Sequence, residues 1–567
     1  MSTSTTPKLT LTQWLICVIA SIGFLFDTYV LLMTPLVGVP AIAELLQVPP
    51  NNPLVTEWMG RMLWMSALSG GIFGLLGGWL IDRFGRKRIM AISIFVYSVS
   101  PIANGLCTTL GMFIFFRCTT FIGVFVEFVA AITWLAETFP DRRQKEMVLG
   151  STQAFASLGG ILVTGVNAWV LAHAGTLPAL PLPEIFNSHA TWRYTLFTGL
   201  IPAIPIALLL PFVPESQVWK ERREAGTLKR PSFAALFSPE LRRVTIVSAL
   251  LSACAYAAAF GALQLTPLRI APGVPEMAET RKSLKPLQDE ARALNLQLIA
   301  ALPAFEEAKR ETPGLAELAA QRARMRIAMR GAKKIVDSPN SGEPEKTAAK
   351  AQLASLAGKF SLLDTNLATM TSAKPEVRQS LAEREKILKL IADNRDKTEP
   401  FDTAVRVVGN KMQGYQETGG LVGRILLALL LFVAMSRRNL LRLFVVPGLI
   451  LFPLTYLVFY RTSADALEWG VFLCGLLVVA QFSYFGEYLP KVFPVHLRGT
   501  GGSFATNVGG RMLGTSAAFL TTNLVAPMIN AQMTFDQVAI AAGLVGTSVF
   551  VIALVLTFFL PEPKAGD

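Results

Sequence analysis

The sequence predicts an all-α polytopic membrane protein with twelve transmembrane helices in two six-helix bundles. A helical, coiled-coil-like extramembrane insert is expected between helices 7 and 8. The composition is too apolar for a soluble chain of 567 residues, because 52% of the residues are hydrophobic, only 16% are charged and the mean hydropathy is +0.47. Apolar stretches of about twenty residues, the length that crosses a bilayer, recur along the chain. Short basic loops separate them, and one turn sequence occurs at equivalent places in both halves.

Six apolar stretches lie in the first half of the chain and six in the second. They begin near Leu11, Met59, Ile89, Leu110, Met147, Arg193, Val244, Thr418, Leu443, Glu468, Gly502 and Val538. The polar N-terminus is short and no small-residue cleavage pattern follows it, so we expect a first span and no removed signal peptide. The expected division is 1–219 for the N-terminal bundle, 220–243 for a cytoplasmic linker, 244–270 for helix 7, 271–415 for an extracytoplasmic insert and 416–567 for helices 8–12.

The positions of Lys and Arg predict which loops face the cytoplasm. Counted from a cytoplasmic N-terminus, the inner loops are 82–88, 141–145, 220–243, 437–442 and 491–498. All carry Lys or Arg, as the positive-inside rule requires. Topology therefore explains the net charge of +13 better than a nucleic-acid partner does. We expect an integral protein of a bacterial inner membrane with both termini in the cytoplasm.

A repeated turn indicates that the second half of the chain repeats the first. Residues 137–143 (ETFPDRR) end the fourth span, and residues 491–499 (KVFPVHLRG) end the tenth. A Phe-Pro pair followed by Arg at matching positions is expected from two related bundles. The repeat has diverged, since Lys491 stands where Glu137 stands in the first half. We therefore expect the cytoplasmic gate to depend mainly on the loop of the first half.

The most specific stretch is residues 77–88 (GGWLIDRFGRKR), between the second and third spans. Asp82 places a carboxylate at a helix C-terminus, where its charge opposes the helix dipole. The basic residues that follow compensate this charge. A merely basic loop would require neither this Asp nor the Gly85 reversal. The order G-x-L-x-D-R-x-G-R-K closely resembles the loop between spans two and three of the major facilitator superfamily. This resemblance implies a cytoplasmic gate made of Gly78, Asp82, Arg83, Gly85, Arg86, Lys87, Glu137, Arg142 and Arg498.

Residues 214–219 (PESQVW) resemble the P-E-S-P-x-W signature that closes the first half of sugar porters and related metabolite symporters. Gln217 replaces the second proline of that pattern. The resemblance covers the whole chain except the insert. It implies proton-coupled symport of a small polar metabolite by alternating access.

A long charged insert, residues 271–415, is expected outside the cytoplasm, where long loops are exempt from the charge rule. Its apolar side chains recur at alternating spacings of three and four, which is a coiled-coil seam. They are Leu284, Leu287, Ala291, Leu294 and Leu298, and further on Leu353, Leu356, Phe360, Leu363, Leu367 and Met370. Prolines such as Pro303 and Pro313 interrupt the seam, so we expect about four helices folded as antiparallel hairpins that stand on the membrane. Disorder is the alternative for so charged a segment, but the sustained seam favours helix.

Asp27 interrupts the apolar first span, where a carboxylate marks a functional site by default. The fourth span carries Arg117 and, further along, Glu127. A rise of about 1.5 Å per residue places Asp27 and Arg117 roughly 14 and 10 Å below the outer face, so they can meet. Proton-coupled sugar porters have an Asp and an Arg at these places, which implies that Asp27 accepts the proton and Arg117 is its partner. Glu127 matches a Glu of metabolite symporters, with a salt bridge inside the bundle as the other interpretation.

The substrate is less well defined by the sequence. Gln153 matches a sugar-porter Gln, but the seventh span lacks the paired Gln that binds sugar hydroxyls, which argues against a hexose. Residues 507–511 (NVGGR) are similar to the N-x-G-R segment of organic-acid symporters, where an Arg would pair with a carboxylate. A structural charge near the cytoplasmic end is the other interpretation of Arg511. The expected substrate-binding residues are Gln153, Tyr256, Tyr484, Asn507 and Arg511.

Three functions fit parts of these observations. Proton-coupled symport of a small polar metabolite, an organic acid rather than a sugar, explains the gate loop, the repeat and Asp27. A proton-driven exporter is the alternative transporter, although residues 157–160 (SLGG) are not the Gly-Pro-rich signature of exporters. A membrane receptor or scaffold would explain the insert but not Asp27.

Enzymatic chemistry is not expected. The sequence has no P-loop, no nucleophile elbow and no zinc-like spacing among His173, His189 and His496. Its cysteines lie singly in apolar segments, which argues against disulfides and structural metal. We expect no cofactor and no metal. The expected partners are protons, a small-molecule substrate and the lipid bilayer. For the insert, two roles stay open, which are binding of a protein partner and self-association.

Overall fold

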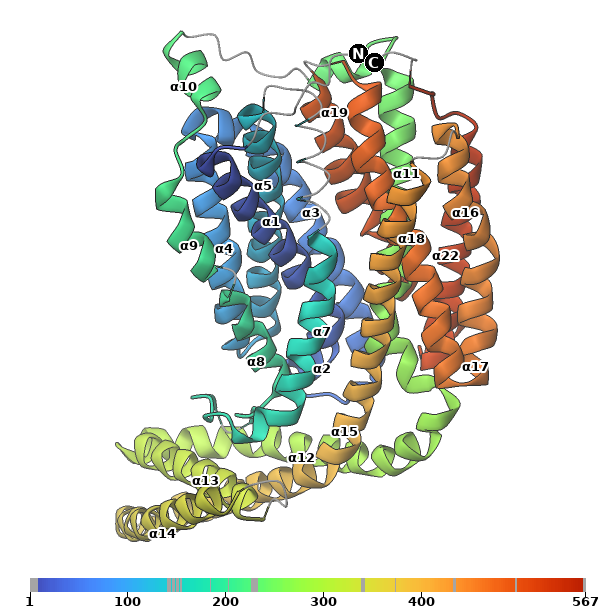
Figure 1. Ribbon diagram of the computed structural model, residues 1–567. Helices are drawn as coiled ribbons and strands as arrows, with labels where there is room; N and C mark the ends of the chain where they lie inside the picture. The colour runs from blue at the N-terminus through green and yellow to red at the C-terminus, as the bar shows by residue number, and fades with distance from the viewer. Residues whose placement is uncertain are drawn as a thin grey trace.

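The computed structural model describes residues 9–139, 144, 148, 152, 155–183, 185–201, 203–225, 233–337, 342–372, 374–431, 435–494 and 497–563. Helices make up most of this part of the chain, and it contains no β-strand. The predicted all-α class is therefore confirmed. Two bundles stand side by side, and a layer of helices from the insert crosses one end of the molecule (Figure 1). We call this the insert end, and the opposite end, which carries Gly85, the Gly85 end.

The first bundle begins with a capping box. Thr10 Oγ1 accepts the backbone N–H of Gln13 at 3.3 Å, and Gln13 Oε1 accepts the backbone N–H of Thr10 at 3.0 Å. Pro35 lacks a backbone donor, and the first span changes direction just before it. The helices are α1 (Leu11–Leu32), α2 (Thr34–Leu46), α3 (Pro53–Phe84), α4 (Arg86–Gly105), α5 (Leu110–Thr138), α7 (Ala156–His173), α8 (Thr191–Phe197), α9 (Ala203–Leu209) and α10 (Gln217–Glu224).

The second bundle begins with the helix before the insert and continues with the last part of the helix that leaves it. Its eleventh span contains a π-helical stretch, η11 (Phe504–Gly514), which carries Asn507 and Arg511. The other helices are α11 (Arg242–Gly261), α15 (Pro375–Leu430), α16 (Arg437–Pro453), α17 (Tyr460–Thr462), α18 (Ala464–Val492), α19 (Arg498–Ser503), α20 (Ala517–Phe519), α21 (Ala526–Ile529) and α22 (Phe535–Thr557).

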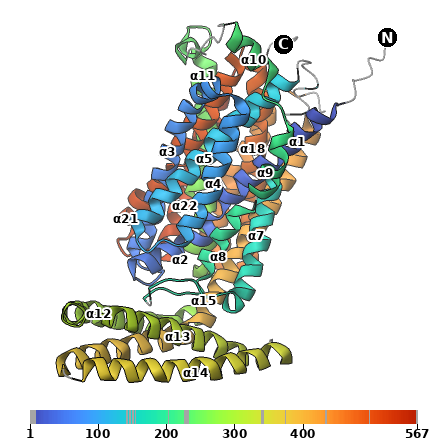
Figure 2. The same ribbon diagram turned by 90° about the vertical axis from the view of Figure 1, so that its left-hand side faces the viewer.

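Nine helical stretches of the described chain are long and apolar enough to cross a bilayer. α3, α4 and the last part of α15 run alongside them in the same two bundles (Figures 1 and 2). α3 and α4 pack against α5, and α15 packs against α18 and α7. With these three, the arrangement matches the predicted twelve helices.

The insert is helical, with α12 (Ala278–Glu311), α13 (Leu315–Asp337), α14 (Glu343–Thr371) and the first part of α15. α12 packs against α15, and α13 packs against α14. Three expectations need correction. The helices lie across the insert end and do not stand on it (Figure 2). Pro303 lies inside α12, because packing against α15 holds that helix together through the proline. Residue 415 lies inside α15, so the insert and the eighth span share one continuous helix.

The insert leaves from the second bundle and docks on the first. Arg395 of α15 donates to the backbone carbonyls of Ile185 at 3.2 Å and Phe186 at 3.4 Å, in the loop between α7 and α8. Arg406 Nη1 donates to the Thr191 hydroxyl at 2.9 Å. Burial lowers the pKa of Arg395, and the Glu44 carboxylate of the first bundle opposes that shift. The insert therefore bridges the two bundles at this end.

Two further contacts join the bundles near the insert end. Arg269, which is 1% exposed, donates to the carbonyl of Pro50 at 2.6 Å and to the Thr56 hydroxyl. Asn167 of α7 donates to Asn410 of α15 at 2.9 Å. These are buried polar contacts with partners on both sides, so they fix the bundles against each other at this end.

Candidate functional site

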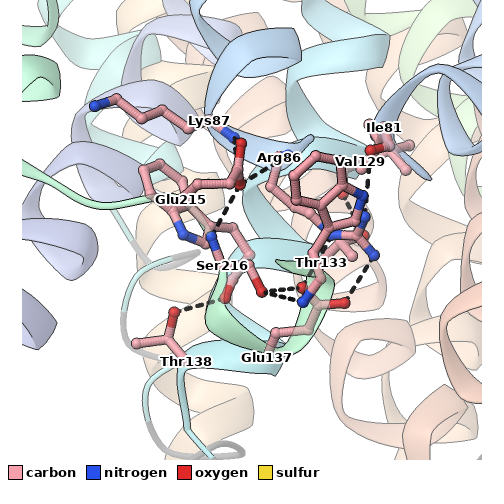
Figure 3. A network of polar contacts seen from close by, with 11 residues as sticks. Ile81, Arg86, Lys87, Val129, Thr133, Glu137, Thr138, Glu215 and Ser216 are labelled. Atoms are coloured by element: carbon pink, nitrogen blue, oxygen red, sulfur yellow. Dashed lines mark hydrogen bonds and ion pairs between the residues drawn. The ribbon is translucent and has the colours of Figure 1, made fainter. Parts of the chain in front are cut away.

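At the Gly85 end, Arg86 at the start of α4 forms a two-bond ion pair with Glu137 at the end of α5 (Figure 3). The Nε–Oε2 distance is 2.9 Å and the Nη2–Oε1 distance is 2.8 Å. Arg86 Nη1 also donates to the carbonyl of Ile81 at 3.2 Å, and Ser216 Oγ donates to Glu137 at 2.6 Å. Such a bidentate pair between a buried arginine and a partly buried glutamate ties the ends of α3, α4 and α5 together.

Glu215 completes this network, and sequence reasoning did not assign it to the gate. Its carboxylate accepts the backbone N–H groups of Arg86 at 2.9 Å and Lys87 at 3.1 Å, which are orphan donors at the N-terminus of α4. Gly85 has φ 97°, and a Cβ at that position would overlap Glu215 Oε2. The glycine is therefore required both for the reversal and for the approach of Glu215. The resemblance of residues 214–219 (PESQVW) to the P-E-S-P-x-W signature was the sequence signal that could have identified Glu215.

The second bundle carries a matching network. Glu562, after the last span, accepts the backbone N–H groups of Arg437 at 3.0 Å and Arg438 at 2.9 Å at the start of α16. The Arg437 side chain pairs with Glu487 at 3.0 Å. Glu487 lies one turn before Lys491 and also pairs with it, so it takes the place that Glu137 has in the first bundle. The second bundle therefore keeps the contacts of the first-half network without its sequence motif, and the dependence of the gate on the first half stays a prediction.

The remaining predicted gate residues are only partly visible. Arg83 lies over the ring of Phe84, with 5.6 Å between the guanidinium carbon and the ring centroid. Lys87 contributes its backbone N–H to the Glu215 cap. Gly78 and Asp82 belong to α3, but the surroundings of Gly78 and the side chains of Asp82 and Arg498 fall outside what the structure describes, and Arg142 lies outside the described residues.

Near the middle of the membrane helices, Asp27 of α1 and Glu127 of α5 lie together. They are 3% and 0% exposed, and each carboxyl group lies within the electrostatic reach of the other and of the charge of Arg511. Gly23, one turn before Asp27, makes room for this, because a Cβ there would overlap Glu127 Oε1. None of the four carboxyl oxygens accepts a hydrogen bond from the described residues, and two buried carboxylates side by side repel each other unless one of them carries a proton.

The predicted contact between Asp27 and Arg117 is not formed in the described structure. The Arg117 guanidinium donates instead to the carbonyls of Val30 and Leu31 at 3.3 and 3.2 Å, and to the hydroxyl of Thr34. The physical reason is the break in the first span. Pro35 cannot donate to the Leu31 carbonyl four residues earlier, so this oxygen is open to the arginine.

Arg511 brings the positive charge to this carboxyl pair from the other bundle. It is 7% exposed, lies over the rings of Phe125 and Phe128 of α5 at 4.6 and 4.2 Å, and contacts Asn507 Oδ1 at 3.5 Å. Tyr256 of α11 packs against Gly510, the residue before Arg511, since a Cβ on Gly510 would overlap the Tyr256 ring. The structure thus brings together Asp27, Glu127, Asn507 and Arg511, and Tyr256 lies against the residue next to Arg511.

Two other predicted substrate residues are not part of this cluster. Tyr484 stacks on Tyr488, with ring centroids 5.4 Å apart, beside Arg437, Glu487 and Glu562 at the Gly85 end. Gln153 lies outside the described residues.

Sequence reasoning also missed a buried polar group on α15. Glu417 is 8% exposed and accepts hydrogen bonds from Gln413 at 2.7 Å and Gln416 at 3.0 Å. Its charge also acts on Arg424, further along the same helix. These residues were overlooked because the eighth span was expected to start at Thr418. An earlier start would have placed a carboxylate inside the span.

Comparison with known proteins agrees with this architecture. The Major Facilitator Superfamily profile matches residues 17–278. This part of the chain is similar to that superfamily, and the solved structure described next shows the same fold over nearly the whole chain. The crystal structure of a D-xylose–proton symporter has a TM-score of 0.56 at 15% identity, covering 97% of this chain and 98% of that one. An inward-open structure of the xylose transporter XylE from E. coli has a TM-score of 0.53 at 14% identity, covering 98% of each chain.

Relatives within the superfamily include transporters of acids. The cis,cis-muconate transport protein of Acinetobacter baylyi is 30% identical over 188 residues, 32% of this chain and 41% of that protein. The sialic acid transporter NanX of Escherichia coli is 27% identical over 191 residues, 34% of this chain and 41% of that protein. The alignments thus span about two-fifths of these relatives. Members of the superfamily are transporters and not enzymes, which agrees with the expectation from the sequence.

Proposed function

We propose that the protein is a secondary active transporter that carries a small polar organic acid together with protons by alternating access. The observation that supports this most strongly is the Asp27–Glu127–Arg511 cluster. Its two carboxyl groups come from the first bundle and its guanidinium from the second. Charged groups within membrane helices are costly, and here they meet across the boundary that alternating access must open.

The cluster can couple the two ligands by exchange of partners. Without a bound solute, Arg511 is neutralised by the charge of Asp27 and Glu127. When the carboxyl pair takes up a proton, Arg511 loses that partner and is free to bind the carboxylate of the solute. The site is neutral when both the proton and the solute anion are bound. Binding of only one of them leaves an unpaired buried charge, which costs several kcal/mol and opposes movement of the bundles.

The networks of Glu137 and Glu487 fit the cytoplasmic side in this proposal, because basic loops surround them. The insert then lies on the outer side of a bacterial inner membrane, and both termini lie in the cytoplasm. The relatives that transport muconate and sialic acid support an acidic solute. A glucose transport protein of Synechocystis, 34% identical over 151 residues, keeps a sugar as the competing class.

The test is uptake by the purified full-length protein in proteoliposomes. Labelled cis,cis-muconate, sialic acid and glucose are offered with and without an inward proton gradient. We expect the gradient to drive accumulation of an acid in the unmodified protein. Asp27→Asn should reduce accumulation to equilibration and leave solute counterflow intact, and Arg511→Gln should weaken binding of the acid. Glu57→Gln, which alters a half-exposed pair with Arg61 outside the cluster, is the matched control.

Gradient-driven accumulation that survives in Asp27→Asn would contradict the coupling role. Efflux of the acid in exchange for protons would identify an exporter instead. Uptake of glucose alone, unaffected by Arg511→Gln, would assign the sugar class.

A further inference from the structure

Three polar side chains follow one face of α15 in the middle of the protein. Gln413, Gln416 and Glu417 stand at helical spacings of three and four, and they are 0%, 5% and 8% exposed. Both glutamine amides donate to the same oxygen, Glu417 Oε1, at 2.7 and 3.0 Å. The carboxylate thereby fixes the orientation of both amides, because an amide offers its NH₂ group to a carboxylate and not its oxygen.

This orientation leaves both amide oxygens without a protein partner. Gln413 Oε1 and Gln416 Oε1 are buried and accept no hydrogen bond from the described residues. Asn410, three residues before Gln413 and also buried, behaves differently. Asn410 accepts from Asn167 at 2.9 Å and donates to the Thr164 carbonyl at 3.2 Å, so its amide is paired on both sides. The Asn410 amide, which forms a structural contact between the bundles, has a hydrogen-bond partner for both its oxygen and its NH₂ group. The amide oxygens of Gln413 and Gln416 have none among the described residues.

The pair also lies where a solute would be held. Glu417 faces α7 of the first bundle, since a Cβ on Gly160 would overlap its Oε2. On the other side, Arg424 interacts with both Glu417 and Tyr256, and Tyr256 lies against Gly510, the neighbour of Arg511. Charge interactions of Arg424 with Glu417 and Tyr256, and the packing of Tyr256 against Gly510, therefore link the amide pair to the region of Arg511.

The geometry points to Gln413 and Gln416 as the hydroxyl-binding part of the solute site, so that the solute is a hydroxylated carboxylic acid. This rests on the proposed function, in which Arg511 binds the carboxylate. Two free carbonyl oxygens require donors, because a buried acceptor without one is destabilising. The donors are hydroxyls and not ammonium groups, because Arg424 already supplies the positive charge beside Glu417.

Equilibrium binding to the purified full-length protein tests this without transport. The probes are carboxylates that differ only in hydroxyl groups, namely gluconate with hexanoate and 4-hydroxybenzoate with benzoate. We expect the hydroxylated member of at least one pair to bind about tenfold tighter or more. Gln413→Leu and Gln416→Leu should each remove most of that preference and leave the affinity of the unhydroxylated acid within about twofold.

The matched control is Gln481→Leu. Gln481 is equally buried, at 2% exposure, but donates to the Leu477 carbonyl of its own helix α18, so the preference should survive this change. Equal affinity for both members of each pair in the unmodified protein would overturn the inference. So would Leu variants that weaken both members equally, since this indicates a structural role.

The same measurements separate this inference from the proposed function. Acids that bind through Arg511, as judged by Arg511→Gln, but without any hydroxyl preference would refute the amide pair alone. No binding of any of the four acids, or binding unaffected by Arg511→Gln, would contradict the proposed organic-acid function and the inference with it.

Discussion

Arg437 at the start of α16 donates its backbone N–H to Glu562 at 3.0 Å, and this repeats in the second bundle the cap that Glu215 makes on α4. Each cap comes from a Pro-Glu pair that follows the last span of its own half. The two halves have therefore kept the contact while the loop sequences around it diverged. In each bundle a glutamate thus caps the helix that follows the loop at the Gly85 end.

We predict that Glu562→Gln slows transport as much as Glu215→Gln does. Each change replaces an acceptor of two backbone N–H groups by an amide with one oxygen, which weakens a helix cap by about 1 kcal/mol and shifts the balance between gate states about fivefold. Initial uptake rates in proteoliposomes measure this. Glu221→Gln on the exposed face of α10 is the control. If only Glu215→Gln has an effect, the second network is structural.

Gly85→Ala should inactivate the carrier with most of the protein still folded. The positive φ strains any side chain by about 1 kcal/mol, and the new methyl group displaces Glu215 from the cap. Uptake per folded molecule, with folding judged by size-exclusion chromatography, is the measurement. Gly111→Ala has open space around the added methyl group and should transport normally. Normal uptake by Gly85→Ala would remove this reversal from the mechanism.

Arg117→Gln should lower stability and leave coupling intact. The arginine donates to the Val30 and Leu31 carbonyls at the break between α1 and α2, and losing it removes hydrogen bonds worth about 0.5–1.5 kcal/mol each, although the Thr34 hydroxyl still donates to the Leu31 oxygen. Thermal unfolding followed by tryptophan fluorescence should move to lower temperature. The ratio of protons to solute should not change. An uncoupled but equally stable variant would instead support a partnership of Arg117 with Asp27 in another state.

Most of the insert should be dispensable for binding of the solute. Asn394 Nδ2 already donates to the Leu287 carbonyl at 3.1 Å, so a short Gly-Ser linker can join these positions in place of residues 288–393. Closing so short a gap costs little loop entropy. Affinity for the best-binding acid should stay within about twofold of the full-length value. A folded deletion variant that no longer binds would place the insert in the solute site.

The sequence was sufficient for the fold and for the residue types of the site, but not for their pairing. Hydropathy and the Gly85 loop predicted the bundles, and depth along a span selected Asp27, Glu127 and Arg511 as candidates. Depth says nothing about rotation around a helix axis, so Asp27 was paired with Arg117 when Glu127 faces it. Glu417 escaped notice because a charged insert runs without interruption into the eighth span, and no composition change marks where α15 enters the membrane.

In the proposed alternating-access cycle, the insert acts as a latch between the two moving bundles, because Arg395 donates a hydrogen bond to the Ile185 carbonyl. It is covalently part of one bundle and is held on the other, at the end that an alternating carrier must open once in every cycle. Release of this latch then belongs to the turnover step and not to recognition of the solute. A binder added from the insert side that grips both α12 and the α7–α8 loop would stop the cycle without ever competing with the solute.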